Sequence, residues 1–184
     1  MKFPEQDVNA LLEGVKKIGR TVEAQAAIGL QVISTYDYAF YKCVERADGE
    51  KKAKEAHKKV WLKHVSDYIK EGELDLGISG VKDILTLGLI TKLAFERRGC
   101  IFEVVETTPE RFVGVITRDA LKEIAGEVFE EKPGSPYMKS LAAASSAIIN
   151  QLVEECGLDK VVKAEQDKSL FLGDDMTRII YSKK

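Results

Sequence analysis

The sequence contains few of the residue types that usually carry metal or redox chemistry. Among its 184 residues there are 2 histidines, 3 cysteines and 1 tryptophan. Cys43, Cys100 and Cys156 are far apart and odd in number, so they indicate neither a disulfide framework nor a Cys-x-x-Cys metal site. We expect three buried free thiols that pack as small apolar groups, and we expect no metal and no cofactor.

An excess of positive charge and long apolar runs are also absent. The net charge is -2 and the pI is about 5.8, so the chain lacks the basic field that nucleic-acid binding requires. No run approaches the roughly 18 apolar residues of a membrane span, and the N-terminus becomes acidic before any signal-peptide core begins. We therefore expect a cytoplasmic protein with no nucleic-acid partner and no membrane partner.

The composition that remains is typical of a folded globular protein. Hydrophobic residues make up 45% of the chain and charged residues 32%. A chain of this length buries roughly 70% of the surface that its unfolded form would expose. It therefore needs no metal ion or disulfide for stability. Because no repeat or long linker interrupts it, we expect a single domain over residues 1–184, mainly helical over 1–99 and mixed over 100–184.

Apolar residues at helical spacing predict a helical N-terminal half. The expected helices span residues 5–46, Glu50–Glu71 and Ser79–Arg97. We expect the first to be broken near Gly19 or Gly29 and the second to be stopped by Gly72. Ser79 is expected to cap the third helix, which is apolar on most sides and should be buried.

The C-terminal half is expected to combine two pairs of strands with two helices. The expected elements are a hairpin of Cys100–Thr107 and Arg111–Thr117, helices from Arg118 to Glu130 and from Pro136 to Cys156, and strands Val161–Glu165 and Thr177–Tyr181. The sequence thus predicts an α+β fold, in which the helical half packs on a small, mainly antiparallel sheet with β-β-α-α-β-β order.

Two short motifs resemble those of a known family. Val115-Ile116-Thr117-Arg118-Asp119-Ala120 ends the expected hairpin, and Leu172-Gly173-Asp174-Asp175-Met176-Thr177-Arg178-Ile179 joins the last two strands. They resemble the L-2-amino-thiazoline-4-carboxylic acid (ATC) hydrolase-like family, which is related to the 4-vinyl reductase small-molecule-binding domains. In that family the hairpin ends in Thr-x-Cys, and a cysteine follows the Gly-Asp-Asp turn.

The cysteines of these groups are replaced here. Asp119 stands where the Thr-x-Cys cysteine would fall, and Ser169 and Thr177 lie near the cysteine positions of 4-vinyl reductase domains. Hydroxyls do not replace thiolates as soft ligands. The resemblance therefore implies the fold and a ligand cavity, but not the cysteine chemistry.

The resemblance leaves two functions open. The first is a metal-independent hydrolase that cleaves C-N bonds of a small cyclic amidine or amide-like substrate, with Asp119 or His64 as a base in place of the cysteine. The second is a non-catalytic small-molecule-binding or accessory domain that has lost its metal or cysteine site. Either function has a small molecule as its partner. A homodimer is a possible assembly for either one. Asp119 has a structural alternative, because it also suits the cap of the following helix.

The remaining candidate residues lie on two expected helices. His57, Trp61 and His64 share one face, although the two histidines are about 10 Å apart along the axis and do not ligate one metal together. Asp37 and Tyr41 form a polar island within an apolar helix.

These residues suggest a ligand pocket. Asp37, Tyr41, His57 and Trp61 are the expected ligand-binding residues, and Asp119 and His64 the expected catalytic ones. Because a buried polar group needs a partner, we expect Tyr41, His64 and Asp119 to line one pocket between the helical half and the sheet. The structural alternative is that each residue is satisfied separately at the edge of the core.

Overall fold

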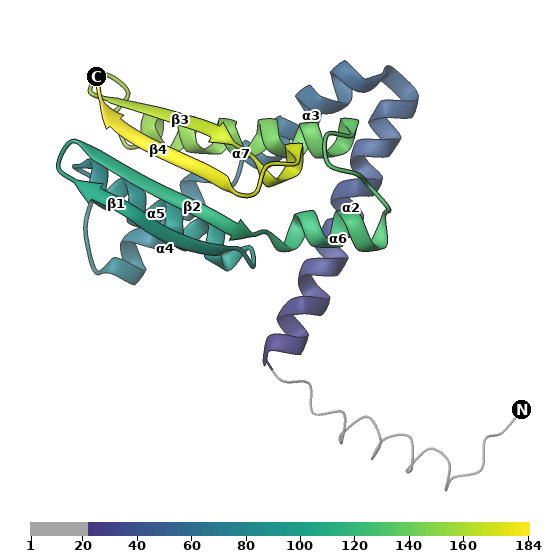
Figure 1. Ribbon diagram of the computed structural model, residues 1–184, viewed down its shortest axis with the longest axis horizontal. Helices are drawn as coiled ribbons and strands as arrows, with labels where there is room; N and C mark the ends of the chain where they lie inside the picture. The colour runs from purple at the N-terminus through teal and green to yellow at the C-terminus, as the bar shows by residue number, and fades with distance from the viewer. Residues whose placement is uncertain (1–21) are drawn as a thin grey trace, which may run out of the picture. The chain divides into compact units, whose positions relative to one another are not determined.

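The computed structural model describes residues 22–184. The chain divides into two units, Met1–Ile33 and Ser34–Lys184, and the sheet and the candidate sites lie in the second. Helix α2 (Val22–Asp48) contains the boundary. The other elements are α3 (Glu50–Leu62), α4 (Val65–Leu76), α5 (Ile84–Arg97), β1 (Ile101–Thr108), β2 (Arg111–Arg118), α6 (Ala120–Val128), α7 (Pro136–Glu155), β3 (Val162–Lys168), a 3-10 helix (Leu170–Leu172) and β4 (Thr177–Lys183) (Figure 1).

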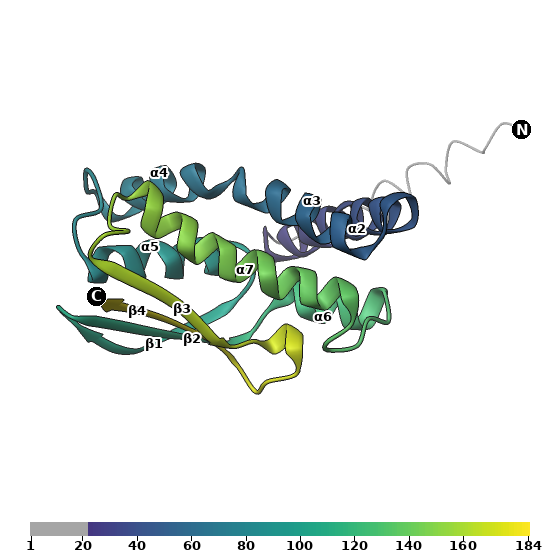
Figure 2. The same cartoon turned by 90° about the horizontal axis from the view of Figure 1, so that it is seen from above.

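The four strands form one sheet in the order β1-β2-β4-β3. Every neighbouring pair is antiparallel, so the expected mainly antiparallel sheet and the α+β class are confirmed. Figure 2 shows α5 and α7 on one face of this sheet. The two hairpins thus meet at the β2 and β4 pair, where Phe112 lies opposite Tyr181.

The core lies between the sheet and these two helices. Its central residues are fully buried and come from α5, α7, β2 and β4: Leu87, Ile90, Ile148, Ile149, Leu152, Phe112, Ile116, Ile179 and Tyr181. Each such side chain contributes about 1.5 to 3 kcal/mol through burial. The Tyr181 hydroxyl lies 2.8 Å from Thr91 Oγ1, so the polar end of this core tyrosine is satisfied.

A close approach of helix and sheet occurs at Gly88 in α5. A Cβ atom at this position would lie 2.3 Å from the Phe112 ring, which is far inside van der Waals contact. Glycine is therefore required here by packing and not by a turn.

The C-terminal elements follow the sequence pattern closely. The hairpin of β1 and β2, the helices α6 and α7, and the strands β3 and β4 all lie where they were expected, within a few residues. Ser135 caps α7 by accepting the Met138 N–H, and Pro136 occupies the first turn. Gly157, with φ of 68°, follows the end of the helix.

The helical half departs from expectation in three places. Helix α2 continues through Gly29 without a break, while Gly19 lies outside the described residues. The single helix expected from Glu50 to Glu71 is two helices, α3 and α4, separated at Lys63 and His64. Gly72 does not stop α4, because it is buried against Ile90 inside the helix, and the helix ends at Gly77 in the left-handed conformation.

Two smaller expectations were also wrong. The cap of α5 is Asp83, whose side chain accepts the Thr86 N–H at 2.7 Å, and not Ser79. The thiols are not all buried: Cys100 is buried, Cys156 is partly buried and Cys43 is exposed.

Candidate functional site

A buried polar network joins α2, α3 and α7. His57 is fully buried, and its Nδ1 lies 2.7 Å from Ser140 Oγ on α7. Its Nε2 lies 2.8 Å from Asp37 Oδ2 on α2. The same carboxylate oxygen accepts the Tyr137 hydroxyl at 2.7 Å, and the Trp61 indole N–H donates to His57 Nε2 at 3.0 Å. The sequence-predicted residues Asp37, His57 and Trp61 are therefore in direct contact.

The donors and acceptors of this network compete for one ring nitrogen. An indole N–H is only a donor, so it seeks a lone pair on His57 Nε2. A carboxylate is only an acceptor, so Asp37 seeks a proton on the same nitrogen. When Nε2 carries the proton and donates it to Asp37, this nitrogen has no lone pair for the Trp61 N–H, so the two contacts are alternative hydrogen bonds.

Tyr41 packs against this network through its ring and makes no hydrogen bond to it. The Tyr41 ring lies 5.6 Å from the His57 ring and 5.3 Å from the Tyr137 ring, measured between centroids. Its hydroxyl is buried and has no hydrogen-bond partner in the described part of the chain. Burial raises the pKa of Tyr41 well above its ordinary value, and the negative charge of Glu45 raises this pKa further. Tyr41 is thus a neutral phenol at physiological pH.

The other two predicted residues lie elsewhere. His64 occupies the junction of α3 and α4, where the break turns it out of the face of His57, and 59% of its side chain is exposed. Asp119 is buried as the cap of α6, and its Oδ1 accepts the backbone N–H groups of Leu121 and Lys122. Its Oδ2 accepts the Cys100 thiol at 3.4 Å. Tyr41, His64 and Asp119 therefore do not converge on one pocket.

The environment of Asp119 favours a structural role. Both of its oxygens are engaged, and desolvation together with the neighbouring Asp119 charge raises the pKa of the Cys100 thiol. A protonated thiol is a poor nucleophile, so this pair has no evident means of attacking a substrate.

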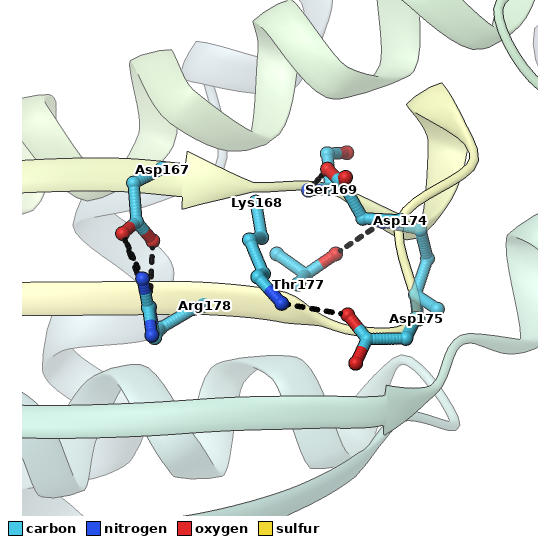
Figure 3. A network of polar contacts seen from close by, with 8 residues as sticks. Asp167, Lys168, Ser169, Asp174, Asp175, Thr177 and Arg178 are labelled. Carbon is cyan, nitrogen blue, oxygen red and sulfur yellow. Dashed lines mark hydrogen bonds and ion pairs between the residues drawn. The ribbon is translucent and has the colours of Figure 1, made fainter.

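The Gly-Asp-Asp turn is built from contacts within the β3 and β4 hairpin (Figure 3). Asp174 accepts the Ser169 N–H at 2.7 Å, and Asp175 pairs with Lys168 at 2.9 Å. The Leu170 N–H donates to Thr177 Oγ1 at 3.0 Å. Both carboxylates thus shape the turn, and no group of three or more potential metal ligands lies within the part of the chain that the structure describes.

An open groove lies at one end of the sheet. Figures 1 and 2 show the turn of the β1 and β2 hairpin, the start of α5 and the end of β4 at this same end. The groove has a volume of about 800 Å³ and is lined by Lys82–Leu85, Thr107–Pro109, Leu158, Lys160–Val162 and Lys183–Lys184. Two of its aliphatic side chains stay largely exposed, Leu85 at 44% and Val161 at 55%.

None of the sequence-predicted site residues lines this groove. A second cavity of about 450 Å³, between α7 and the β3 strand with its turn, also lacks them. The network and the groove are therefore separate features. The network is buried, whereas both cavities are open to solvent.

Two participants were missed by the sequence interpretation. Ser140 and Tyr137 lie three residues apart on α7, and both are buried. The sequence places both on the same helical face as Leu141, Ala144 and Ile148. This position could have identified them, because a hydroxyl on a buried apolar face needs a polar partner.

No protein-family model matches the sequence, and no curated protein matches it. Among residues 22–184, no helix has the length and apolar character needed to cross a membrane.

Solved structures share the fold. One is subunit 3 of the trafficking protein particle complex from Naegleria fowleri, covalently bound to palmitic acid, with 19% identity and a TM-score of 0.57 over 85% of this chain and 96% of that one. Another is the phenol-responsive sensory domain of the transcription activator PoxR with phenol, with 10% identity and a TM-score of 0.54 over 84% of this chain and 74% of that one. At these identities the likeness concerns the fold alone.

Proposed function

We propose that this chain is a non-catalytic small-molecule-binding domain whose binding site is the groove at the end of the sheet. The observation that carries the proposal is the groove itself, with a volume of about 800 Å³ and exposed aliphatic walls at Leu85 and Val161. Ligand sites in proteins are typically concave, mostly apolar and about 300 to 1,000 Å³ in volume. A monomer gains nothing in stability from leaving such side chains in water.

The fold supports this proposal, and so do the positions of the residues expected to be catalytic. Two proteins of similar fold were solved with a small molecule, palmitic acid in one and phenol in the other. The residues proposed as catalytic, Asp119 and His64, lie respectively in a helix cap and on an open surface. A binding role requires neither of them to act as a base.

Titration with the neutral fluorescent probe N-phenyl-1-naphthylamine tests the proposal. We expect saturable binding that Leu85→Gln weakens about tenfold or more, since this change removes the apolar wall. Leu74→Gln is the matched control, because Leu74 is 81% exposed on α4 and lies outside the groove. Absence of saturable binding, or an equal loss in both variants, would overturn the proposal.

A hydrolase is the second candidate, favoured by one observation. Ser140 Oγ, the His57 ring and the Asp37 carboxylate form a hydrogen-bonded chain in the order of nucleophile, base and carboxylate. In this candidate function, His57 would be the base for attack on a cyclic amidine or amide-like substrate, in place of His64. Because Ser140 and His57 are almost completely buried, the reaction would need an opening between α3 and α7.

A fluorophosphonate probe distinguishes this candidate. Covalent labelling of Ser140 that is lost in Ser140→Ala and His57→Gln would support hydrolysis. If the wild-type protein is not labelled but still binds the neutral probe, the hydrolase candidate is wrong and the binding function stands.

A further inference from the structure

The charges of the groove differ from those of the whole chain. The net charge of the chain is -2, yet the side chains that line the groove include four lysines, Lys82, Lys160, Lys183 and Lys184, and one acidic residue, Asp83. A concave site lined mainly by one sign of charge concentrates the field and attracts ligands of the opposite sign.

Two of these lysines are already occupied. Lys183 pairs with Glu110 at 3.1 Å, and Lys184 donates to the Asp159 carbonyl oxygen. Lys82 and Lys160 form no ion pair within residues 22–184, so their ammonium groups are available. They come from two different segments, the loop before α5 and the connection between α7 and β3.

The opposing carboxylate is partly engaged as well. Asp83 accepts the Thr86 N–H as the cap of α5, which directs its charge toward the positive end of that helix. The apolar residues Leu85, Pro109 and Val161 line the same groove as the two available ammonium groups. A ligand that matches this arrangement has an apolar body and one anionic group.

We infer that the groove selects a monoanionic amphiphile, such as a free aliphatic carboxylate, with the anion held by Lys82 and Lys160 and the apolar part on Leu85 and Val161. This inference rests on the proposed binding function and names the ligand class of the same site. Because the lysines are exposed, each contributes a modest gain that added salt reduces.

Displacement of the neutral probe by ligands with one common tail tests the inference. Decanoate, 1-decanol and decylammonium are compared at low salt, below the concentrations at which they form micelles. We expect decanoate to bind about five- to tenfold more tightly than 1-decanol, and decylammonium to bind more weakly than both. The advantage of decanoate should shrink as salt is added.

Variants assign this selectivity to the two lysines. Lys82→Gln with Lys160→Gln should reduce decanoate affinity to that of 1-decanol. Lys58→Gln on α3, outside the groove, is the control and should change neither. Equal weakening of decanoate and 1-decanol in the double variant would show that the lysine stems, and not their charges, matter, and would overturn the inference.

The remaining outcomes separate the two claims. If the probe binds but decanoate and 1-decanol displace it equally, the charge selectivity is wrong and the binding function stands. If the probe does not bind at all, the proposed function itself is wrong. Sedimentation with phosphatidylglycerol vesicles that decanoate does not prevent would overturn the free carboxylate as the occupant, in favour of a lipid surface.

Discussion

Asp37 shows how a single carboxylate can hold three helices together. It lies on α2, accepts the Tyr137 hydroxyl from α7 and contacts His57 Nε2 from α3. Breaking a buried polar network by removing one member costs more than the network contributes, because the other members lose their partners. The role of Asp37 in stability is therefore measurable apart from any role in function.

We predict that Asp37→Ala lowers the free energy of unfolding by about 2 to 4 kcal/mol. Tyr137→Phe removes one donor and leaves the Asp37 and His57 pair intact, so its cost should be about 1 kcal/mol. Urea unfolding of both variants and of the double variant measures the coupling. Strict additivity would show that the two groups do not interact as the structure indicates.

The three thiols should differ in reactivity because the thiolate is the reactive form. Cys43 is exposed, and Cys100 is buried with its pKa raised by desolvation and by Asp119. Burial, with smaller effects of Glu73 and Glu155, raises the pKa of Cys156 to about 11. Iodoacetamide at about pH 8 should label Cys43 first, Cys156 slowly, and Cys100 only on unfolding.

Mass spectrometry of a labelling time course checks this order. Labelling of Cys156 should accelerate as the pH rises toward its raised pKa. Equal labelling rates at Cys43 and Cys100 in the folded protein would contradict the expected order.

At the level of elements, the sequence predicted helix starts and strand pairs better than interruptions. Ser135 and Pro136 begin α7 as expected, because a hydroxyl cap and a preset φ are local effects. The break at Lys63 and His64 contains no glycine or proline that would predict it. Gly72 lies inside α4, where the lack of a side chain allows close contact with Ile90. The contact of Gly72 with Ile90 joins two different helices, and a single sequence does not display such a contact.

The α6 cap yields a prediction about Asp119. We expect Asp119→Ala to cost about 0.5 to 2 kcal/mol of stability and to leave ligand binding unchanged, since its oxygens serve the Leu121 and Lys122 N–H groups and the Cys100 thiol. Asp119→Asn is the control, because an amide oxygen still accepts at a cap. Calorimetry and the probe titration together check both parts. Loss of binding in a variant that melts normally would restore a functional role for Asp119.

The contact of α5 with the sheet yields a second prediction at this scale. Gly88→Ala should destabilise the protein by about 1 to 3 kcal/mol, because the new methyl group would overlap the Phe112 ring and force the helix outward. Gly29→Ala on α2 is the matched control, since a Cβ there meets nothing within 4 Å. Chemical denaturation measures the difference. A neutral Gly88→Ala would mean that the helix and the ring can separate at little cost.

For the whole molecule, the fold class was accessible from the sequence and the groove proposed as a binding site was not. The hairpin, the last two strands and the mainly antiparallel sheet follow from residue patterns along the chain. Asp37, His57 and Trp61 were identified because same-face spacing is local, whereas Ser140 was missed because its partner His57 is 83 positions away. The groove was missed because it joins the start of α5, a hairpin turn and a connection after α7, which become neighbours only in the fold.

The buried phenols predict how the whole molecule responds to alkali. Burial is the main cause that raises the pKa values of Tyr41, Tyr137 and Tyr181 above the ordinary value of about 10. The folded state therefore keeps protons that the unfolded chain releases, and the free energy of unfolding should fall as the pH rises above about 9 to 10. We expect tyrosinate absorbance from these residues to appear together with the loss of far-ultraviolet circular dichroism, in one cooperative step. If all the tyrosines instead ionised smoothly while the circular dichroism stayed native, the core between the sheet and its helices would be open to hydroxide, contrary to the packing described for the folded chain.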